Sequence, residues 1–188
     1  MALRRTTDAT SEPISTAVAK AHLRVTTATD DTLIDTLVKA CRLIAENELQ
    51  RSLITQTWTK TLDEFPDAIV LEYPPIATVS SVKYLDSAGA QQTLSASQYT
   101  VDIQSEPGYI VRAYGVDWPE TYDAINAVEI IYVAGYGSAV DVPQAIKSWI
   151  LLQVGHLYEN REATMPGISI TPLPFIGGLL DGYRVVTF

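Results

Sequence analysis

The sequence predicts an α+β protein in which helices on both sides enclose an antiparallel β-rich insert. Residues 31–45 repeat apolar side chains every three or four positions, as an amphipathic helix does. Residues 54–62 alternate with a period of two, as a strand does. Helical periodicity returns only in residues 143–161. We therefore expect a bundle of two N-terminal helices and one long C-terminal helix, with a β-rich subdomain inserted and an extended C-terminal arm following.

Length and composition predict one folded domain spanning residues 1–188. The chain has 47% apolar and 19% charged residues, as ordinary folded proteins do. No apolar run follows Arg4 and Arg5, so a secretory signal is not expected. No segment approaches the eighteen apolar residues of a membrane span, so no membrane partner is expected. A soluble protein of a reducing compartment fits these features.

The N-terminal helices are predicted within residues 13–52, after a polar and loose segment 1–12. Ser15 is a candidate N-cap for a short helix ending near Leu23. Thr29 or Asp30 can cap the longer second helix. Cys41, the single cysteine, lies on the apolar face of that helix, which predicts a buried and inert thiol.

The β-rich insert is predicted over residues 53–141. Strand patterns occur at residues 54–62, 68–73, 79–94 (a hairpin around Gly89), 99–103 with 109–113 (a second hairpin), and 127–136. Six or seven short strands then form one antiparallel sheet or two packed sheets. The apolar run in residues 127–136 predicts a strand that is buried on both faces.

The insert carries the whole negative excess of the chain, whose net charge is −9. Residues 53–141 contain twelve acidic and only three basic residues. Such a surface repels phosphate, which disfavours a protein that grips nucleic acid. An acidic surface that only keeps the β-rich part soluble is the alternative. Eight of the ten tyrosines lie between Tyr73 and Tyr136, and tyrosine suits protein interfaces.

The closing helix is predicted over residues 142–161, with Pro143 at its first position. Its apolar residues cover more than one stripe, which predicts burial on two sides, one against its own core and one against a neighbouring subunit. Gly155 costs about 1 kcal/mol of helix propensity relative to alanine. These apolar residues are Ile146, Trp149, Ile150, Leu151, Leu152, Val154, Leu157 and Tyr158.

Residues 162–188 are predicted to be an apolar arm. Its prolines and glycines exclude a long helix, and its large apolar side chains predict docking, each burial being worth roughly 1.5–3 kcal/mol. Its own domain and another chain are both open as docking sites. Residues 183–188 could also add a strand to an exposed sheet edge.

No catalytic, metal-binding or cofactor-binding cluster is predicted. His22 and His156 are the only histidines, and with one cysteine the ligand count for a metal site fails. The glycines of residues 133–138, VAGYGS, match no phosphate-binding loop. We therefore predict that the chain is not an enzyme and needs no cofactor.

Several blocks of this sequence, in order, resemble the head–tail connector family of tailed bacteriophages. More narrowly, they resemble prophage-type connectors with the label "possible DNA-packaging protein". The blocks are AKAHLRV, DDTLIDTLVKACRLIAENELQRSLITQTW, VAGYGSAVDVPQAIKSWILLQVGHLYENRE and the closing LPF and YRV. The likeness runs from about residue 13 to the end, and the middle strands match in pattern more than in identity.

The resemblance implies a structural virion protein made in the host cytoplasm and located in the virion neck. It implies a ring, commonly of twelve copies, below the portal. The ring extends the DNA channel, passes double-stranded DNA without specific binding, and joins the capsid to the tail. Partners would be the portal protein and the next connector, stopper or tail terminator protein. A DNA-packaging accessory factor that contacts terminase or DNA is the alternative, and a basic patch at Arg4, Arg5, Lys20 and Arg24 would support it. A small hydrolase is a third reading.

Three sets of residues follow as candidates. The portal-docking arm would use Leu173, Pro174, Phe175, Tyr183, Arg184, Val185, Val186 and Phe188. The subunit interface of the ring would use Trp149, Leu152, Leu157 and Tyr158. An acidic channel surface would use Asp63, Glu64, Asp67, Asp86, Asp102 and Glu106.

Overall fold

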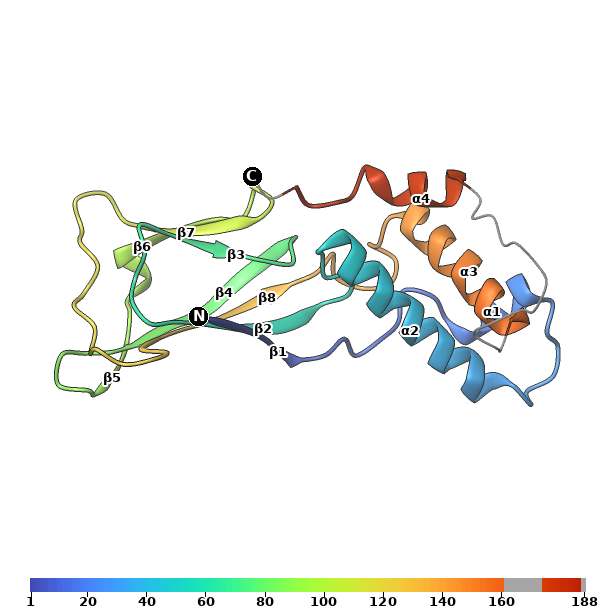
Figure 1. Cartoon of the computed structure of the whole chain (residues 1–188), viewed down its shortest axis with the longest axis horizontal. Helices are drawn as coiled ribbons and strands as arrows, with labels where there is room; N and C mark the ends of the chain where they lie inside the picture. The colour runs from blue at the N-terminus through green and yellow to red at the C-terminus, as the bar shows by residue number, and fades with distance from the viewer. Residues whose placement is uncertain (161–173, 187–188) are drawn as a thin grey trace, which may run out of the picture. The chain divides into compact units, whose positions relative to one another are not determined.

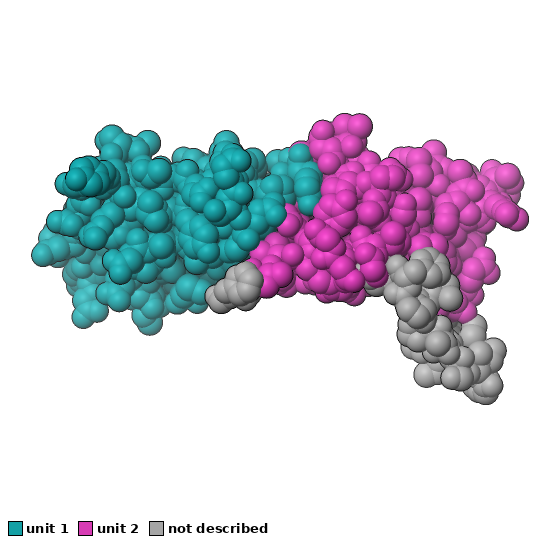
Figure 2. Space-filling view, turned by 90° about the horizontal axis from the view of Figure 1, so that it is seen from above, with its two compact units in different colours: residues 1–10, 55–136, 187–188 teal, residues 11–54, 137–186 magenta. Residues whose placement is uncertain are grey.

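The computed structural model describes residues 1–160 and 174–186, and it has the predicted α+β architecture. The chain divides into two compact units (Figure 2). Unit 1 contains residues 1–10 and 55–136 and holds the strands. Unit 2 contains residues 11–54 and 137–186 and holds the helices.

Figure 1 labels the elements. The strands are β1 (Ala2–Thr7), β2 (Gln56–Leu62), β3 (Ala68–Leu71), β4 (Ile76–Leu85), β5 (Gln91–Thr93), β6 (Tyr99–Asp102), β7 (Gly108–Arg112) and β8 (Val128–Ala134). A short 3-10 helix, η1 (Ala96–Gln98), precedes β6. The α-helices are α1 (Thr16–Leu23), α2 (Asp31–Leu49), α3 (Gln144–Glu159) and α4 (Pro174–Asp181).

Unit 1 consists of two antiparallel sheets that share one core. The larger sheet has the order β1-β2-β8-β4-β5, and the smaller has the order β3-β7-β6. Buried residues of both sheets contact one another, among them Trp58 and Tyr132 from the larger sheet and Ile69 and Ile110 from the smaller. Of the two predicted arrangements, two packed sheets is therefore the one observed.

Strand β2 follows its predicted alternation, including two polar residues on the buried face. Gln56 and Lys60 are buried on the side of Trp58 and Leu62. Burying a charge is costly unless it is paired and hydrogen-bonded. The Lys60 Nζ meets this need by donating to the Val70 carbonyl at 2.7 Å and the Glu72 carboxylate at 2.6 Å.

The first residues of the chain form an edge strand, so the expectation that residues 1–12 are loose was wrong for residues 2–7. Strand β1 pairs with β2 in register Leu3↔Lys60 and Arg5↔Trp58. Leu3 packs against the core, and the Arg5 guanidinium lies over the Trp58 ring at 5.9 Å. A six-residue edge strand needs only one buried face. Strand β1 therefore has few apolar residues, and its sequence shows little of the alternation that predicts a strand.

Strand β8 is fully buried on one face only, which corrects the expectation of two buried faces. Val128, Ile130, Tyr132 and Ala134 are buried, whereas the residues between them are half-buried. The larger sheet keeps a partly exposed outer face, which is common for antiparallel sheets.

In unit 2 the two N-terminal helices occupy the predicted ranges. Ser15 caps α1 by accepting a hydrogen bond from the Val18 N–H. Asp30 occupies the N-cap position of α2 but makes no side-chain cap bond there. Its carboxylate instead accepts a 2.5 Å hydrogen bond from the Tyr158 hydroxyl, which ties α2 to α3. Cys41 is buried, as predicted, and burial raises the pKa of its thiol to about 11.

Unit 2 also contains a buried ion cluster on α2. Arg42 is fully buried, and its guanidinium contacts Glu12 at 2.7 Å and Glu46 at 2.9 Å. The second oxygen of Glu46 accepts from the Leu53 N–H at 3.0 Å. Several polar partners compensate the buried charge. Because Glu12 precedes α1 and Leu53 follows α2, the cluster also connects these two segments of the chain.

Helix α3 begins at Gln144, one residue later than predicted. Pro143 therefore occupies the N-cap position and not the first helical position. It contacts α1, α2 and α4 of its own chain. Three helices packed around it explain why its apolar residues cover more than one stripe. Burial of its second side therefore does not require a neighbouring subunit, which the sequence allowed.

Candidate protein-binding surfaces

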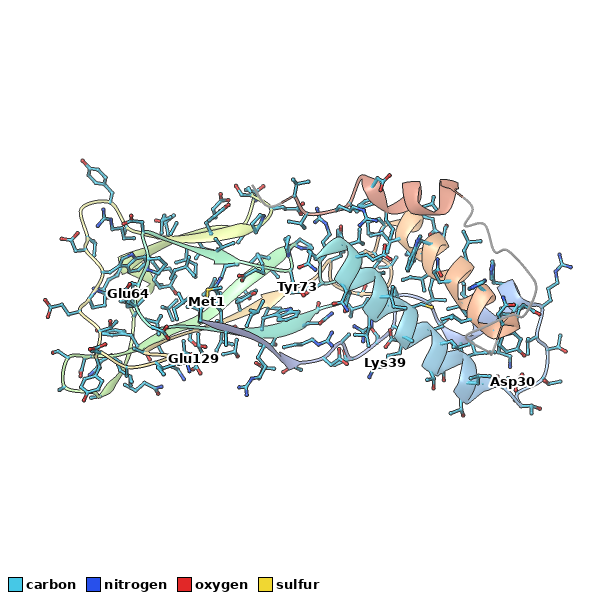
Figure 3. All side chains as sticks on the ribbon, in the orientation of Figure 1. Met1, Asp30, Lys39, Glu64, Tyr73 and Glu129 are labelled. Atoms are coloured by element: carbon cyan, nitrogen blue, oxygen red, sulfur yellow. The ribbon has the colours of Figure 1, made fainter. Side chains whose placement is uncertain are left out.

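One end of unit 1 brings together three loops, which lie at the left of the view in Figure 1. Strands β2 and β4 both run antiparallel to β8, and Leu62 and Tyr84 both pair with Val128. The β2–β3 loop (63–67), the β4–β5 turn (86–90) and the β7–β8 loop (113–127) therefore emerge together. Figure 3 labels Glu64 at this end. We name residues 113–127 the tip loop.

The tip loop is fixed to its neighbours although it contains no helix or strand. The Trp118 ring stacks on Phe65 with centroids 4.8 Å apart, and its Nε1 donates to the Pro66 carbonyl at 2.9 Å. The Tyr122 N–H donates to the Leu85 carbonyl at 3.0 Å. The Asn126 N–H donates to the Asp63 carboxylate at 2.9 Å. The loop is thus anchored to the β2–β3 loop and to the last residue of β4.

Large apolar side chains of the tip loop face solvent. Tyr114 is fully exposed, and Ile125 and Tyr122 are 82% and 46% exposed. A recess of about 610 Å³ lies between the tip loop and the β2–β3 loop. Its lining comprises Asp63, Glu64, Thr121, Tyr122, Asp123, Ala124 and Ile125, so three apolar or aromatic side chains lie beside three carboxylates.

The six predicted channel carboxylates fall into two groups at different ends of the strands. Asp63, Glu64, Asp67 and Asp86 lie in the β2–β3 loop and the β4–β5 turn. Asp102 and Glu106 lie at the β6–β7 turn. The β2–β3 loop leads into the first residue of β3, whereas the β6–β7 turn lies next to its last residue, because Leu71 pairs with Gly108. The structure therefore does not bring the six together on one surface.

Three of these aspartates also stabilise their turns. The Gln92 side chain and the Ala90 and Ala88 N–H groups donate to Asp86 and lower its pKa. The Asn126 N–H and the positive N-terminus of the chain lower the pKa of Asp63. The Ser105 hydroxyl, followed by backbone N–H groups, lowers the pKa of Asp102.

The predicted subunit interface on α3 is only partly available. Trp149 is 4% exposed and belongs to the core of unit 2, so a neighbouring subunit could not contact its side chain. Leu152, Leu157 and Tyr158 are half-buried. The Tyr158 hydroxyl is bonded to Asp30, which leaves the two leucines as the apolar surface of this set.

The described part of the predicted arm lies against unit 2. Leu173 and Phe188 lie outside the described residues, and Pro174 and Phe175 belong to α4. Leu180 of α4 is fully buried. The arm could dock on its own domain or on another chain, and this described part docks on its own domain.

Residues 183–186 continue this contact along the C-terminal end of α2. The Val185 N–H donates to the Leu49 carbonyl at 3.1 Å, and the Tyr183 carbonyl accepts from Arg51. Arg184 contacts Glu48 at 3.4 Å, and Val186 is 59% exposed. These residues do not extend a sheet edge.

Other kinds of site have little support in the described residues. The candidate basic residues Arg4 and Arg5 lie in unit 1, whereas Lys20 and Arg24 lie in unit 2, and Lys20 pairs with Asp31 at 2.6 Å. No group of three or more metal-ligating side chains occurs in residues 1–160 and 174–186. Within the same ranges no helix has the length and apolarity needed to cross a membrane.

The exposed apolar residues of the tip loop were not predicted as a site. The excess of tyrosine in the insert was the available signal, because Tyr114 and Tyr122 belong to it. Their exposure could not be read from the sequence, since Tyr132 of the same group is buried in the core.

Solved structures share this fold over the whole chain. A chain in the neck of an empty gene transfer agent (GTA) particle, computed with C6 symmetry, has a TM-score of 0.83 and 23% identity. A chain in the virion of a native GTA particle has a TM-score of 0.81 and 22% identity. A chain in the neck of a native GTA particle with C12 symmetry has a TM-score of 0.74 and 22% identity. Each comparison covers 100% of this chain and 97% of the other.

No protein-family model and no curated protein sequence matches the chain. At 22–23% identity, the solved structures establish the fold of this chain and no more. That fold is shared by chains found in the necks and the virion of gene transfer agent particles.

Proposed function

We propose that this chain is a structural protein of the neck of a phage-like particle, an adaptor that joins the capsid to the tail. The observation that carries the proposal is the end-to-end likeness to chains in GTA necks, at a TM-score up to 0.83. A match that spans both units and nearly the whole of the other chain supports a shared place in the particle better than one shared subdomain would. The resemblance of the sequence to head–tail connectors supports the same role.

Within this role the chain forms a ring around the DNA. The C6 and C12 symmetries of the GTA necks favour six or twelve copies. A closed ring needs a head-to-tail contact between two different surfaces of the subunit. Leu152 and Leu157 on α3 are candidates for one of them. Ile44 on α2, which is 43% exposed, is a candidate for the other.

The C-terminal residues 162–188 bind the portal protein in this proposal. Val186 offers an exposed apolar side chain, and Arg184 an exposed charge, at the end of the described chain. Val186→Asp should weaken attachment to the portal without disturbing unit 2. Val140→Asp is a matched control, because Val140 is 80% exposed in the same unit. Equal attachment by both variants and the unmodified protein would argue against this role for Val186.

The acidic residues of unit 1 keep passing DNA from binding. Residues 1–10 and 55–136 of this unit contain twelve acidic and five basic residues, and this excess repels phosphate, so a duplex near them would slide. The next connector, stopper or tail terminator binds the ring on its other side.

Particles assembled with and without this chain test the proposed function. Without the chain, electron microscopy should show heads that lack tails, and a plasmid-borne copy should restore tailed particles. A reconstruction of the restored neck should show a ring into which both units fit. Normal tailed particles in the absence of the chain would refute the proposal.

A further inference from the structure

We propose that the tip loop, residues 113–127, docks onto a second protein whose surface carries Lys and Arg side chains around an apolar recess. The inference rests on the proposed function, because it places that second protein in the same particle. It adds a binding surface, and the chemistry of its partner, to a unit whose role is otherwise only to repel DNA.

The first observation is the unusual exposure of apolar surface on one loop. Tyr114, Tyr122 and Ile125 all belong to the tip loop, and each is exposed. Single exposed apolar residues are normal, but several on one loop beside a recess are typical of an interaction site. Tyrosine is enriched at such sites, because it offers a large apolar contact and a polar end.

The second observation is that the loop is held in place without being covered. Loops of this length without a helix or strand are uncommon and are often functional. The Phe65–Trp118 stack and the hydrogen bonds of Tyr122 and Asn126 fix its backbone. A surface that is ordered before binding loses less conformational entropy when the partner arrives.

The third observation is the charge around these apolar residues. The tip loop, the β2–β3 loop and the β4–β5 turn together contain seven carboxylates and no Lys, Arg or His. The seven are Asp63, Glu64, Asp67, Asp86, Asp117, Glu120 and Asp123. Arg112, just before the tip loop, pairs with Asp117 at 3.2 Å, and the N-terminus of Met1 lies 3.6 Å from Asp63.

This charge selects the occupant. A second copy that paired tip loop to tip loop would bring the same acidic loops, and nucleic acid would bring phosphates, so both are repelled. A protein surface with a basic rim is attracted and can seat Tyr114 and Ile125 in its recess. The inference moves Asp63, Glu64, Asp67 and Asp86 from the proposed channel surface to a protein interface. Asp102 and Glu106 remain channel candidates.

Photo-crosslinking in assembled particles tests this inference. Position 114 receives the photoreactive residue benzoylphenylalanine, which replaces one fully exposed aromatic ring with another. Irradiation of purified particles should join this chain to a different protein of the particle. Mass spectrometry should locate the crosslink in a peptide that contains Lys or Arg.

Charge reversal supplies the matched comparison. Glu120→Lys with Asp123→Lys should reduce the crosslink about tenfold or more, because like charges then meet across the rim. Asp35→Lys with Glu159→Lys changes the net charge equally but lies outside the three loops, and it should leave the crosslink unchanged. Thermal unfolding of the purified variants shows that each is folded.

The outcomes separate the inference from the proposed function. Particles that contain the chain but crosslink from position 114 only to its own copies, to DNA or to nothing would overturn the inference alone. Equal effects of the two charge reversals would overturn it as well. Absence of the chain from the particles would overturn both the inference and the proposed function.

Discussion

Phe65 and Trp118 stack face to face in unit 1, with their ring centroids 4.8 Å apart and their planes 9° from parallel. The two rings come from different loops, and the Trp118 Nε1 also donates to the carbonyl of Pro66. Phe65 in turn meets the edge of Tyr84 on β4, 5.9 Å away between centroids. One side chain of the tip loop is thereby joined to the edge of the shared core.

Trp118→Ala should lower the free energy of unfolding by roughly 1–3 kcal/mol, because it removes a half-buried ring and a hydrogen bond. Urea denaturation measures the loss, and limited proteolysis should show faster cleavage within residues 113–127. A double-mutant cycle with Phe65→Ala should give a coupling of about 0.5–1.5 kcal/mol. A coupling of zero would mean that the stack does not hold the loop.

Gly108→Ala should destabilise unit 1 by about 1–3 kcal/mol. A Cβ atom at this position would lie 2.8 Å from Ile76 Cγ1 and 3.0 Å from the Asp102 carbonyl. Gly108 lies on β7 of the smaller sheet and Ile76 on β4 of the larger sheet, so the cost measured by urea denaturation should be smaller in an Ile76→Ala background. An equal cost in both backgrounds would contradict the contact.

Gly155→Ala should have the opposite sign and stabilise unit 2 by up to about 1 kcal/mol. Here the added Cβ would lie 3.5 Å from His22 Nε2, which is ordinary van der Waals contact. The approach of α1 to α3 at this position is therefore not close enough to require a glycine. Thermal unfolding decides the sign, and a lower melting temperature would disprove the prediction.

Leu180→Ala should cost about 2–5 kcal/mol, because Leu180 is fully buried on α4. Leu179→Ala is the matched control, since Leu179 is only half-buried and should cost less. Both losses are measured by chemical denaturation of the full chain. Small and equal losses would show that α4 is not docked on α3.

Asp102→Asn should weaken the dependence of stability on acidic pH. The hydrogen bonds from Ser105 and Gln104 lower the pKa of Asp102 below its ordinary value of 3.8. Its charged form therefore stabilises the fold above that value, and the stabilisation is lost as the pH falls through the lower folded-state pKa. Unfolding measured between about pH 5 and pH 2 should show a smaller decrease for the variant. A decrease equal to that of the unmodified protein would contradict the assignment.

Much of the fold could be predicted from local patterns. Helix α2 and strand β2 follow from periods of 3.6 and 2, because each needs one apolar face. Ser15 could be recognised as a cap, because its hydroxyl satisfies an N–H group within the same turn. These features depend on residues that are neighbours in sequence.

The candidate sites were harder to predict, because they depend on what covers a residue. Trp149 and Leu152 are both apolar residues on α3, yet one lies in the core and the other is half-buried. Tyr114 and Tyr132 are identical in type, and only the fold exposes the first and buries the second. The edge strand β1 was missed for a related reason, since most of its stabilising partners lie on β2, more than fifty residues away.

Composition and short repeats were enough to predict the α+β class, the first three helices, the acidic character of the β-rich insert and the burial of Cys41. None of these features depends on the path of the chain. The enclosure of α3 by α1, α2 and α4, the separation of six acidic residues into two groups and the meeting of three loops at one end of unit 1 all depend on the tertiary structure. The pairing of Leu62 and Tyr84 with the same residue, Val128, brings those loops together. Strand pairing between distant segments is a property of the whole fold, and no local pattern encodes it.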